Sequence, residues 1–280
     1  MLARQALCIA QEQLSAVNVC DAKREAWLIC AYLCAVEPGQ LALFMERNLD
    51  EALLNCLLAR RIAGEPLQYV LGEAGFMGLT FAVGTGVLIP RPDTEVLVEK
   101  AIFLLKEEKT LQLADIGTGS GAIAVSLAYY LPQAQVYGVD ISPLALFWAK
   151  MNALRYKISE HCHLYEGDMF APLIAQDLRF DMIISNPPYL SAADMMQLAP
   201  ELFREPAIAL DGGTDGLDYY RRLAQEAGLL LNSDGKLLLE HGWQQQQQVE
   251  LLLRQNGWLI RERINDYGGR ARGLLAVLEK

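Results

Sequence analysis

The stretch Leu111–Gly121, which reads LQLADIGTGSG, decides the fold class of this chain. Its first half, Leu111–Ile116, is an apolar run typical of a buried strand, and the glycines that follow allow a tight turn. A helical pattern over Ala122–Tyr130 comes next, so the turn lies beside a helix N-terminus, where ligands often bind. We therefore interpret the stretch as a strand–turn–helix unit of an α/β sheet.

Strands and helices alternate through the rest of the chain. Predicted strands cover Val136–Asp140, His163–Glu166, Met182–Ser185, Lys236–Glu240, Leu259–Asn265 and Leu274–Leu278, and predicted helices cover Leu144–Lys157, Leu217–Leu231 and Gln244–Gln255. This alternation predicts a mostly parallel sheet with helices on both faces. The last two strands have no helix between them, which predicts one antiparallel edge strand.

The first 72 residues are predicted to form a small helical bundle domain. Apolar residues recur at helical spacing over residues 2–63, with Asp21 as a candidate N-cap and Pro38-Gly39 as a break. Short apolar runs with glycines predict a linking β-hairpin within residues 73–90, before a sheet domain at 91–280. At its start, Thr94 or Asp93 is expected to cap a helix beginning at Glu95.

Composition excludes several classes of protein. The 280 residues are 52% hydrophobic and 21% charged, as in an ordinary globular protein. The net charge of −10 argues against a broad phosphate-binding surface and hence against stable nucleic-acid binding. No stretch approaches the roughly 20 apolar residues of a membrane span. The six cysteines contain no C-x-x-C pair, so we expect buried, reduced thiols in a cytoplasmic protein and no metal site.

The tetrapeptide Asn186-Pro187-Pro188-Tyr189 is the strongest candidate for chemistry. It follows the predicted strand over 182–185, and its prolines stiffen the backbone at the strand's carboxyl end, where open α/β sheets bind ligands. The Asn186 amide oxygen and the Pro187 carbonyl can each accept one hydrogen of a planar –NH2 group, while the Tyr189 ring stacks on its face. A glutamine amide and an adenine amine satisfy this pattern equally, and an ordinary strand-ending turn is the plainer interpretation.

Acidic residues near the glycine turn indicate which cofactor it holds. Asp115 suits a ligand ammonium better than a diphosphate, and Asp140, some 20 residues on, can accept both ribose hydroxyls unless it only caps the next helix. Ammonium and ribose without phosphate describe S-adenosylmethionine better than NAD. Asp168 is a candidate for the adenine amino group and Met169 for its face. The candidate cofactor-binding residues are Asp115, Gly117, Thr118, Gly119, Ser120, Gly121, Asp140, Asp168, Met169 and Asn186.

Together these motifs make the chain resemble the class I S-adenosylmethionine-dependent methyltransferases, which have a Rossmann-like sheet. Within them it resembles the HemK-type family, which methylates a glutamine of peptide chain release factors. The resemblance rests on the segments Gly64–Gly72, Leu88–Glu95, Asp115–Gly121, Asp140–Ser142, Asn186–Tyr189, Glu205–Ala207, Asp211–Asp218 and Asp266–Arg270.

The resemblance implies a substrate and a donor. The substrate is the glutamine of the Gly-Gly-Gln loop in release factors of both codon classes, and the donor is S-adenosylmethionine. Asn186, Pro187 and Tyr189 are the expected catalytic residues, and they bind substrate together with Pro188. Arg91 is a further substrate-binding candidate, with a salt bridge to Glu205 or Asp93 as its alternative.

Other interpretations stay open. A sister family methylates a ribosomal-protein glutamine, but Pro92–Glu95 favours the release-factor family. An adenine-N6 DNA methyltransferase uses a similar turn, and a scaffold without chemistry is a third alternative. No general base is identified. Arg270 and Arg272 are expected to be solvated on a loop between edge strands.

Overall fold

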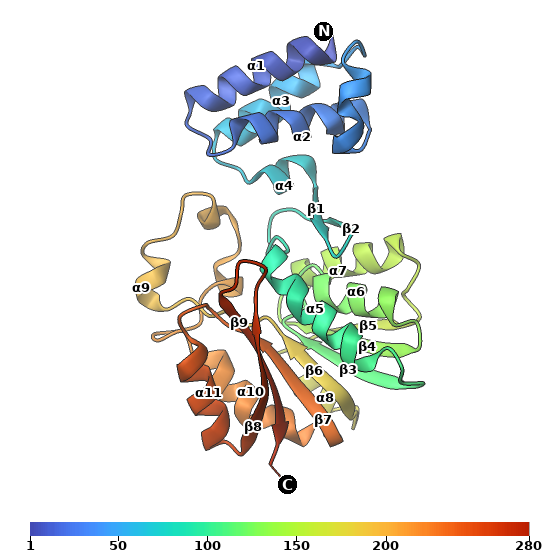
Figure 1. Ribbon diagram of the computed structural model, residues 1–280, viewed down its shortest axis with the longest axis vertical. Helices are drawn as coiled ribbons and strands as arrows, with labels where there is room; N and C mark the ends of the chain where they lie inside the picture. The colour runs from blue at the N-terminus through green and yellow to red at the C-terminus, as the bar shows by residue number, and fades with distance from the viewer. Residues whose placement is uncertain (280) are drawn as a thin grey trace. The chain divides into compact units, whose positions relative to one another are not determined.

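The structure is a computed structural model that describes residues 1–279 and divides into two compact units. The helical unit comprises Met1–Glu73 with Pro200–Arg204. The sheet unit comprises residues 74–199 and 205–279, and it contains the seven-stranded sheet (Figure 1). The segment 200–204 lies in the middle of the sequence of the sheet unit but packs with the helical unit.

Helices make up most of the helical unit. They are α1 (Ala3–Ala16), α2 (Ala22–Cys34), the 3₁₀ helix η1 (Pro38–Phe44), α3 (Glu51–Ile62) and α4 (Leu67–Leu71). Asp21 is confirmed as the N-cap of α2, because its carboxylate accepts the Arg24 N–H. The predicted break after the second helix is present but lies slightly earlier than Pro38-Gly39. Helix α2 ends at Cys34 with Ala35 as a left-handed C-cap, and Pro38 occupies the first turn of η1, where its fixed φ is favourable. Leu14, Ile29 and Leu54 are fully buried in the core.

A buried arginine holds segment 200–204 within the helical unit. Arg61 is only 4% exposed, and its guanidinium contacts Glu25 at 2.6 Å and Glu201 at 2.5 Å. Arg204 donates a hydrogen bond to the Ala63 carbonyl at 3.0 Å. Because a buried charge is costly without partners, these two carboxylates stabilise the Arg61 guanidinium.

The cysteines are free, and only half follow the prediction of burial. Cys30, Cys34 and Cys162 are buried, whereas Cys8, Cys20 and Cys56 are exposed. Cys8 and Cys56 were mispredicted because they lie on the solvent side of helices α1 and α3, and Cys20 lies in the turn between α1 and α2. Within residues 1–279 no single helix is both long and apolar enough to cross a membrane, although α2 and η1 together, bent by 71°, meet the length and composition conditions.

The sheet has the strand order β5-β4-β3-β6-β7-β9-β8. The strands are β3 (Leu111–Ile116), β4 (Ala134–Asp140), β5 (Cys162–Glu166), β6 (Phe180–Ser185), β7 (Leu231–Glu240), β8 (Trp258–Asn265) and β9 (Ala271–Leu278). The first five are mutually parallel. The one antiparallel strand, β9, pairs with both β7 and β8, so β8 takes the edge position. This confirms the predicted mostly parallel α/β fold class.

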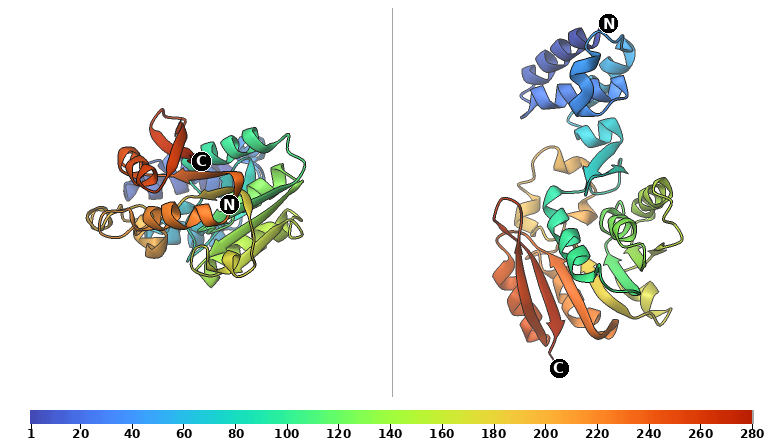
Figure 2. Two further views of the ribbon diagram at one scale, coloured as in Figure 1. Left: turned by 90° about the horizontal axis from the view of Figure 1, so that it is seen from below. Right: turned by 45° about the vertical axis from the view of Figure 1, so that its right-hand side comes forward.

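Helices cover both faces of the sheet (Figures 1 and 2). One layer contains α5 (Pro92–Leu105), α6 (Ala122–Tyr130) and α7 (Pro143–Arg155), and the other contains α8 (Ala171–Ile174), α10 (Asp218–Glu226) and α11 (Gln246–Gln255). Tyr220 and Leu223 of α10 pack in one core with Leu253 of α11 and Ile183 of β6. The helix predicted over 217–231 ends earlier, because the chain tightens into η4 (Ala227–Leu229) before β7 begins.

Shorter elements complete the fold. The predicted hairpin is present as β1 (Glu73–Phe76) and β2 (Leu79–Ala82), and the long connection after β6 holds α9 (Ala192–Met195), η2 (Leu202–Arg204) and η3 (Ala207–Ala209). The expected cap for a helix starting at Glu95 was wrong, because α5 starts at Pro92 with Arg91 as N-cap. Thr94 therefore lies inside the first turn and is buried. The displacement follows from proline's preference for the first helical position.

Candidate active site

The site lies where the strand order reverses. The chain runs outward from β3 to β4 and β5, then returns to pair β6 on the other side of β3. The connections that leave the carboxyl ends of β3 and β6 run in opposite directions at this point, which is the preferred ligand site of an open α/β sheet. A hydrogen bond of 2.6 Å from the Ser185 hydroxyl to the Ile116 carbonyl joins the two strand ends.

A cavity with an empty volume of about 1070 Å³, including its open mouth, occupies this position. It lies within the sheet unit. Its wall contains these predicted site residues: Arg91, Gly117, Thr118, Gly119, Ser120, Asp140, Asp168, Met169, Asn186, Pro187 and Pro188. Three predicted residues do not line it, namely Asp115, Gly121 and Tyr189.

The glycine turn is shaped to admit a ligand. Gly117 has a φ of +76°, and a Cβ added there would meet no heavy atom within 4 Å, so its open side faces the cavity. Gly121 serves packing instead, because a Cβ there would lie 3.0 Å from Val125 and 3.2 Å from Ala149. The turn thus combines close ligand approach with close helix packing.

Asp115 supports the turn from beneath. It is fully buried, and one carboxylate oxygen accepts hydrogen bonds from the Thr118 hydroxyl at 2.6 Å and the Ala124 N–H at 3.1 Å. The other oxygen, Oδ1, is buried with no partner among the described residues. Burial raises the pKa of Asp115 to about 7. An unpaired oxygen of this kind is suited to a cationic group, but the Asp115–ammonium contact stays a prediction.

Asp140 is at the end of β4 and on the cavity wall. Its carboxylate accepts the Gly119 N–H at 2.8 Å and the Ser142 N–H at 2.9 Å. The helix-cap alternative fails, because Ser142 caps α7 by accepting the Ala145 N–H. Burial raises the pKa of Asp140 against the effect of those backbone bonds. The carboxylate keeps lone pairs for further donors such as ribose hydroxyls.

The candidate adenine residues follow β5. Met169 is buried on the cavity wall with a φ of +49°, an uncommon conformation for a residue with a side chain. Asp168 also lines the cavity, but its carboxylate accepts two bonds from the Arg222 guanidinium, at 2.8 and 3.0 Å. Tyr219 of α10 lines the same region and was not predicted. Its helical pattern carried no signal of a cavity.

The Asn186 side chain is held from the first turn of α5. Its Nδ2 donates to the Thr94 hydroxyl oxygen at 3.1 Å, and within residues 1–279 no partner is recorded for its Oδ1. Both residues line the cavity. Thr94 was not predicted as a site residue, because its position before an apolar helical pattern indicated a helix cap. The amide oxygen of Asn186 is therefore available as an acceptor in the cavity.

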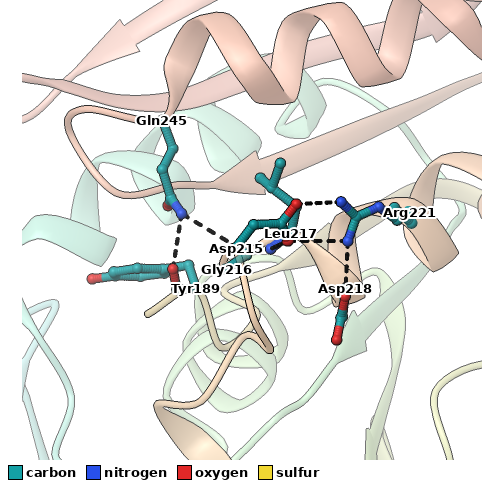
Figure 3. A network of polar contacts seen from close by, with 7 residues as sticks. All are labelled: Tyr189, Asp215, Gly216, Leu217, Asp218, Arg221 and Gln245. Carbon is teal, nitrogen blue, oxygen red and sulfur yellow. Dashed lines mark hydrogen bonds and ion pairs between the residues drawn. The ribbon is translucent and has the colours of Figure 1, made fainter. Parts of the chain in front are cut away.

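The backbone after the tetrapeptide is clamped by Gln245, the N-cap residue of α11. Its amide Nε2 donates to the Tyr189 carbonyl at 2.8 Å and reaches the Gly216 carbonyl at 3.5 Å (Figure 3). A second brace comes from Leu190, whose N–H donates to Leu210 and whose carbonyl accepts the Gly212 N–H. These contacts fix the exit of the turn.

Glycines allow the segment over 211–216 to pack directly on the turn. A Cβ at Gly212 would lie 2.9 Å from the Pro188 carbonyl oxygen, and one at Gly216 would lie 2.4 Å from the Tyr189 carbonyl oxygen. Asp215 keeps the segment in shape by accepting bonds from the Arg221 guanidinium, as Figure 3 shows. The segment Asp211–Asp218 resembles the HemK-type family in sequence, and its backbone contact with the tetrapeptide explains that resemblance structurally.

Two arginines form ion pairs in and around the site. Arg91 lines the cavity and forms a salt bridge with Glu205, whose other oxygen accepts the Ile89 N–H at 3.0 Å. Arg272 corrects the prediction of a solvated charge. It lies in β9, only 7% exposed, and contacts Asp93 at 2.9 Å and Asp266 at 3.3 Å. Arg272 was mispredicted because β9 begins at Ala271, before the apolar run that starts at Leu274.

The cavity's donors and acceptors fit S-adenosylmethionine. The open glycine turn and the carboxylate of Asp140 on the wall match a ribose without phosphate, and the unpaired buried oxygen of Asp115 lies beneath the turn, outside the cavity wall. A family model described as "Methyltransferase small domain" matches residues 92–216, and one described as "PrmC N-terminal domain" matches residues 5–72. Fold and site thus define a methyltransferase that uses S-adenosylmethionine as its methyl donor.

Two relatives narrow this class. A protein of Moorella thermoacetica named release factor glutamine methyltransferase is 43% identical over 280 residues, covering 99% of this chain and 98% of the relative. One of Geobacter sulfurreducens with the same name is 48% identical over 219 residues, covering 77% and 75%. The chain belongs to the release factor glutamine methyltransferase family.

A solved structure supports the fold independently. A methyltransferase from Pyrococcus furiosus superposes with a TM-score of 0.52 at 19% identity, covering 79% of this chain and 96% of the other. At this identity the likeness concerns the fold alone. The predicted combination of a methyltransferase sheet with an N-terminal helical domain agrees with both family models.

Proposed function

We propose that this protein transfers a methyl group from S-adenosylmethionine to the side-chain amide nitrogen of the Gly-Gly-Gln glutamine in peptide chain release factors. The observation that carries the proposal is the orientation of Asn186: its Nδ2 is engaged by Thr94, which leaves Oδ1 as an acceptor on the cavity wall. The names of the two relatives support release factors as substrates over ribosomal proteins.

The cavity has residues for each part of the donor. Asp140 is proposed to accept the ribose hydroxyls, the turn over 117–121 to lie against the ligand backbone, and Met169 to pack on the adenine. Asp168 is proposed for the adenine amino group and Asp115 for the ammonium group. Bound S-adenosylmethionine supplies a methyl group on a positively charged sulfur.

The substrate nitrogen needs orientation more than ionisation. The lone pair of an amide nitrogen is delocalised into its carbonyl, so the amide is a poor nucleophile. The Asn186 Oδ1 and the Pro187 carbonyl are proposed to accept one N–H each, which turns one face of the nitrogen toward the methyl group. Positive charge develops on that nitrogen during transfer, and the two acceptors stabilise it. Correct orientation contributes up to roughly 7–11 kcal/mol in favourable systems.

Electrons and protons balance without a protein base. The nitrogen lone pair forms the new N–C bond, the S–C bonding pair stays on sulfur, and one N–H proton then leaves to water. Tyr189 is proposed to cover the substrate amide, although it does not line the cavity. Its backbone carbonyl is held by Gln245, so the turn is braced before substrate arrives. Pro188 is proposed to complete the substrate contact, and Arg91 to contact it at the rim.

The partner is proposed to be a protein. The chain carries a net charge of −10, which disfavours a nucleic-acid substrate. Six free cysteines are consistent with work in the reducing cytoplasm, where translation ends.

Mass spectrometry tests the proposal. A release factor of each codon class is incubated with the enzyme and a donor carrying a deuterated methyl group, then digested and sequenced. We expect a labelled methyl on the Gly-Gly-Gln glutamine. Parallel reactions contain a large-subunit ribosomal protein fraction and an adenine-containing DNA duplex. Label in either of these, and not in the release factors, would contradict the proposal.

A further inference from the structure

A line of polar groups runs inward from the cavity behind Asn186. Asn186 follows β6, Thr94 lies in the first turn of α5, and Glu240 ends β7. The Asn186 amide donates to the Thr94 hydroxyl oxygen at 3.1 Å. The Thr94 hydroxyl in turn acts on Glu240 as a hydrogen-bond partner that lowers the pKa of its carboxyl group. Thr94 is 4% exposed and Glu240 is 1% exposed, so both side chains are largely shielded from bulk water.

The protons in this line have one arrangement when Glu240 is ionised. A carboxylate only accepts hydrogen bonds, so the single hydroxyl proton of Thr94 points to Glu240. The Thr94 oxygen is then left as an acceptor, and only the Nδ2 side of the Asn186 amide can satisfy it. The Oδ1 side consequently faces the cavity, where the substrate's N–H groups need an acceptor.

We propose that Thr94 and Glu240 are positioning residues that orient the Asn186 amide, so that its oxygen and not its nitrogen is presented to the substrate nitrogen. The inference rests on the proposed transfer to a glutamine amide, which it deepens by assigning what holds the acceptor in place. Neither residue touches the reacting atoms. An Asn186 amide turned the other way would present N–H groups to the substrate's own N–H groups and oppose binding in the reactive pose.

The surroundings of Glu240 make this orientation dependent on pH. Glu240 Oε2 is buried with no partner among the described residues, and burial raises the pKa of Glu240 to about 7. The groups that act on its charge are Thr94, Arg91 and Asp93 at the start of α5, Arg272 of β9, Tyr189 of the turn and Tyr220 of α10. When protonated, Glu240 can donate a hydrogen bond to the Thr94 oxygen. The Thr94 hydroxyl proton is then free to point toward Asn186, which reverses the direction of both hydrogen bonds.

The sign of the effect follows from this reversal. The ionised form of Glu240 supports the reactive orientation, so turnover is lost as pH falls through about 7. For a single controlling group with that pKa, the loss is about tenfold between pH 8 and pH 6. Asp115 has a pKa raised to about 7 as well, so a variant of Glu240 is needed to assign the change.

Three variants, Thr94→Val, Thr94→Ser and Glu240→Gln, test the positioning role. Methylation of a release factor and calorimetric binding of S-adenosylmethionine are measured for each. Thr94→Val keeps the shape of the side chain but removes the hydroxyl, and we expect kcat to fall on the order of 10²-fold while donor affinity stays near that of the wild type. Thr94→Ser restores the hydroxyl and is expected to restore most of kcat. Wild-type kcat in Thr94→Val would overturn the role of Thr94.

Glu240→Gln separates the inference from the proposed function. The glutamine oxygen still accepts the Thr94 hydroxyl but does not ionise, so turnover is expected to persist with a flat profile between pH 6 and pH 8. A profile that keeps the wild-type fall would overturn the role of Glu240, and this test stands even if Thr94→Val does not fold. Failure of the wild-type enzyme to methylate any release factor would instead contradict the proposed function.

Discussion

Replacing Gly216 by alanine tests whether backbone contact with the tetrapeptide supports the site. Gly216 has a φ of +74°, which costs a residue with a side chain about 1–2 kcal/mol. The added Cβ would also lie 2.4 Å from the Tyr189 carbonyl oxygen and 2.7 Å from Gln245 Nε2. Relieving such overpacking costs about 1–3 kcal/mol more. Gly216→Ala is thus expected to destabilise the protein by about 2–5 kcal/mol and to displace the Tyr189 carbonyl.

A matched control separates strain from the effect on the site. Gly257 has a φ of +80°, and a Cβ there would meet nothing within 4 Å, so Gly257→Ala carries only the backbone cost. Urea unfolding measures the stability of both variants, and calorimetry and methylation kinetics measure donor affinity and turnover. We expect turnover to fall on the order of 10²-fold in Gly216→Ala and to stay unchanged in Gly257→Ala. Equal stability and equal turnover in the two variants would refute the reasoning.

Three further predictions concern the groups beneath and beside the cavity. Burial raises the pKa of Asp115 from 3.8 to about 7. Between these two pH values the folded state retains a proton that the unfolded chain releases. As pH rises through this range, Asp115 therefore lowers the free energy of unfolding by up to about 4 kcal/mol. Asp115→Asn is expected to flatten that fall in urea unfolding at pH 5 and pH 8, and an unchanged slope would contradict it. Gly117→Ala places a Cβ into open cavity space, so calorimetry should register at least about tenfold weaker donor binding, and unaltered affinity would count against the glycine turn as the donor site. Glu205→Gln removes the ion pair with Arg91 but keeps an acceptor for the Ile89 N–H, and thermal unfolding should report a loss of about 1–3 kcal/mol, with no loss arguing against a supporting role.

The local sequence pattern was sufficient to predict most strands and helices of the sheet unit. The apolar run over 111–116 and the helical pattern over 122–130 coincide with β3 and α6, because each buries a continuous apolar face in the core. The glycine turn and Asp140 were located in sequence because strand ends and glycines mark ligand sites in parallel sheets. The strand order, with β9 inserted between β7 and β8, depends on pairing across the sheet and has no local signal.

Contacts between distant residues account for what the sequence did not predict. Thr94 and Asn186 are 92 residues apart, and Gln245 and Tyr189 are 56 apart. Neither pair carries a spacing that indicates contact, since the tertiary fold alone brings them together. Arg272 illustrates the same limit, because its carboxylate partner Asp93 lies at the start of α5.

The central claim is that the Asn186 amide oxygen orients the substrate nitrogen for methyl transfer. The direct measurement is single-turnover methylation of a release factor by Asn186→Ala, with S-adenosylmethionine affinity determined on the same preparation. We predict a variant that folds and binds the donor but loses most of its methyl-transfer rate. A near-normal rate in a folded, donor-bound Asn186→Ala variant would contradict the claim.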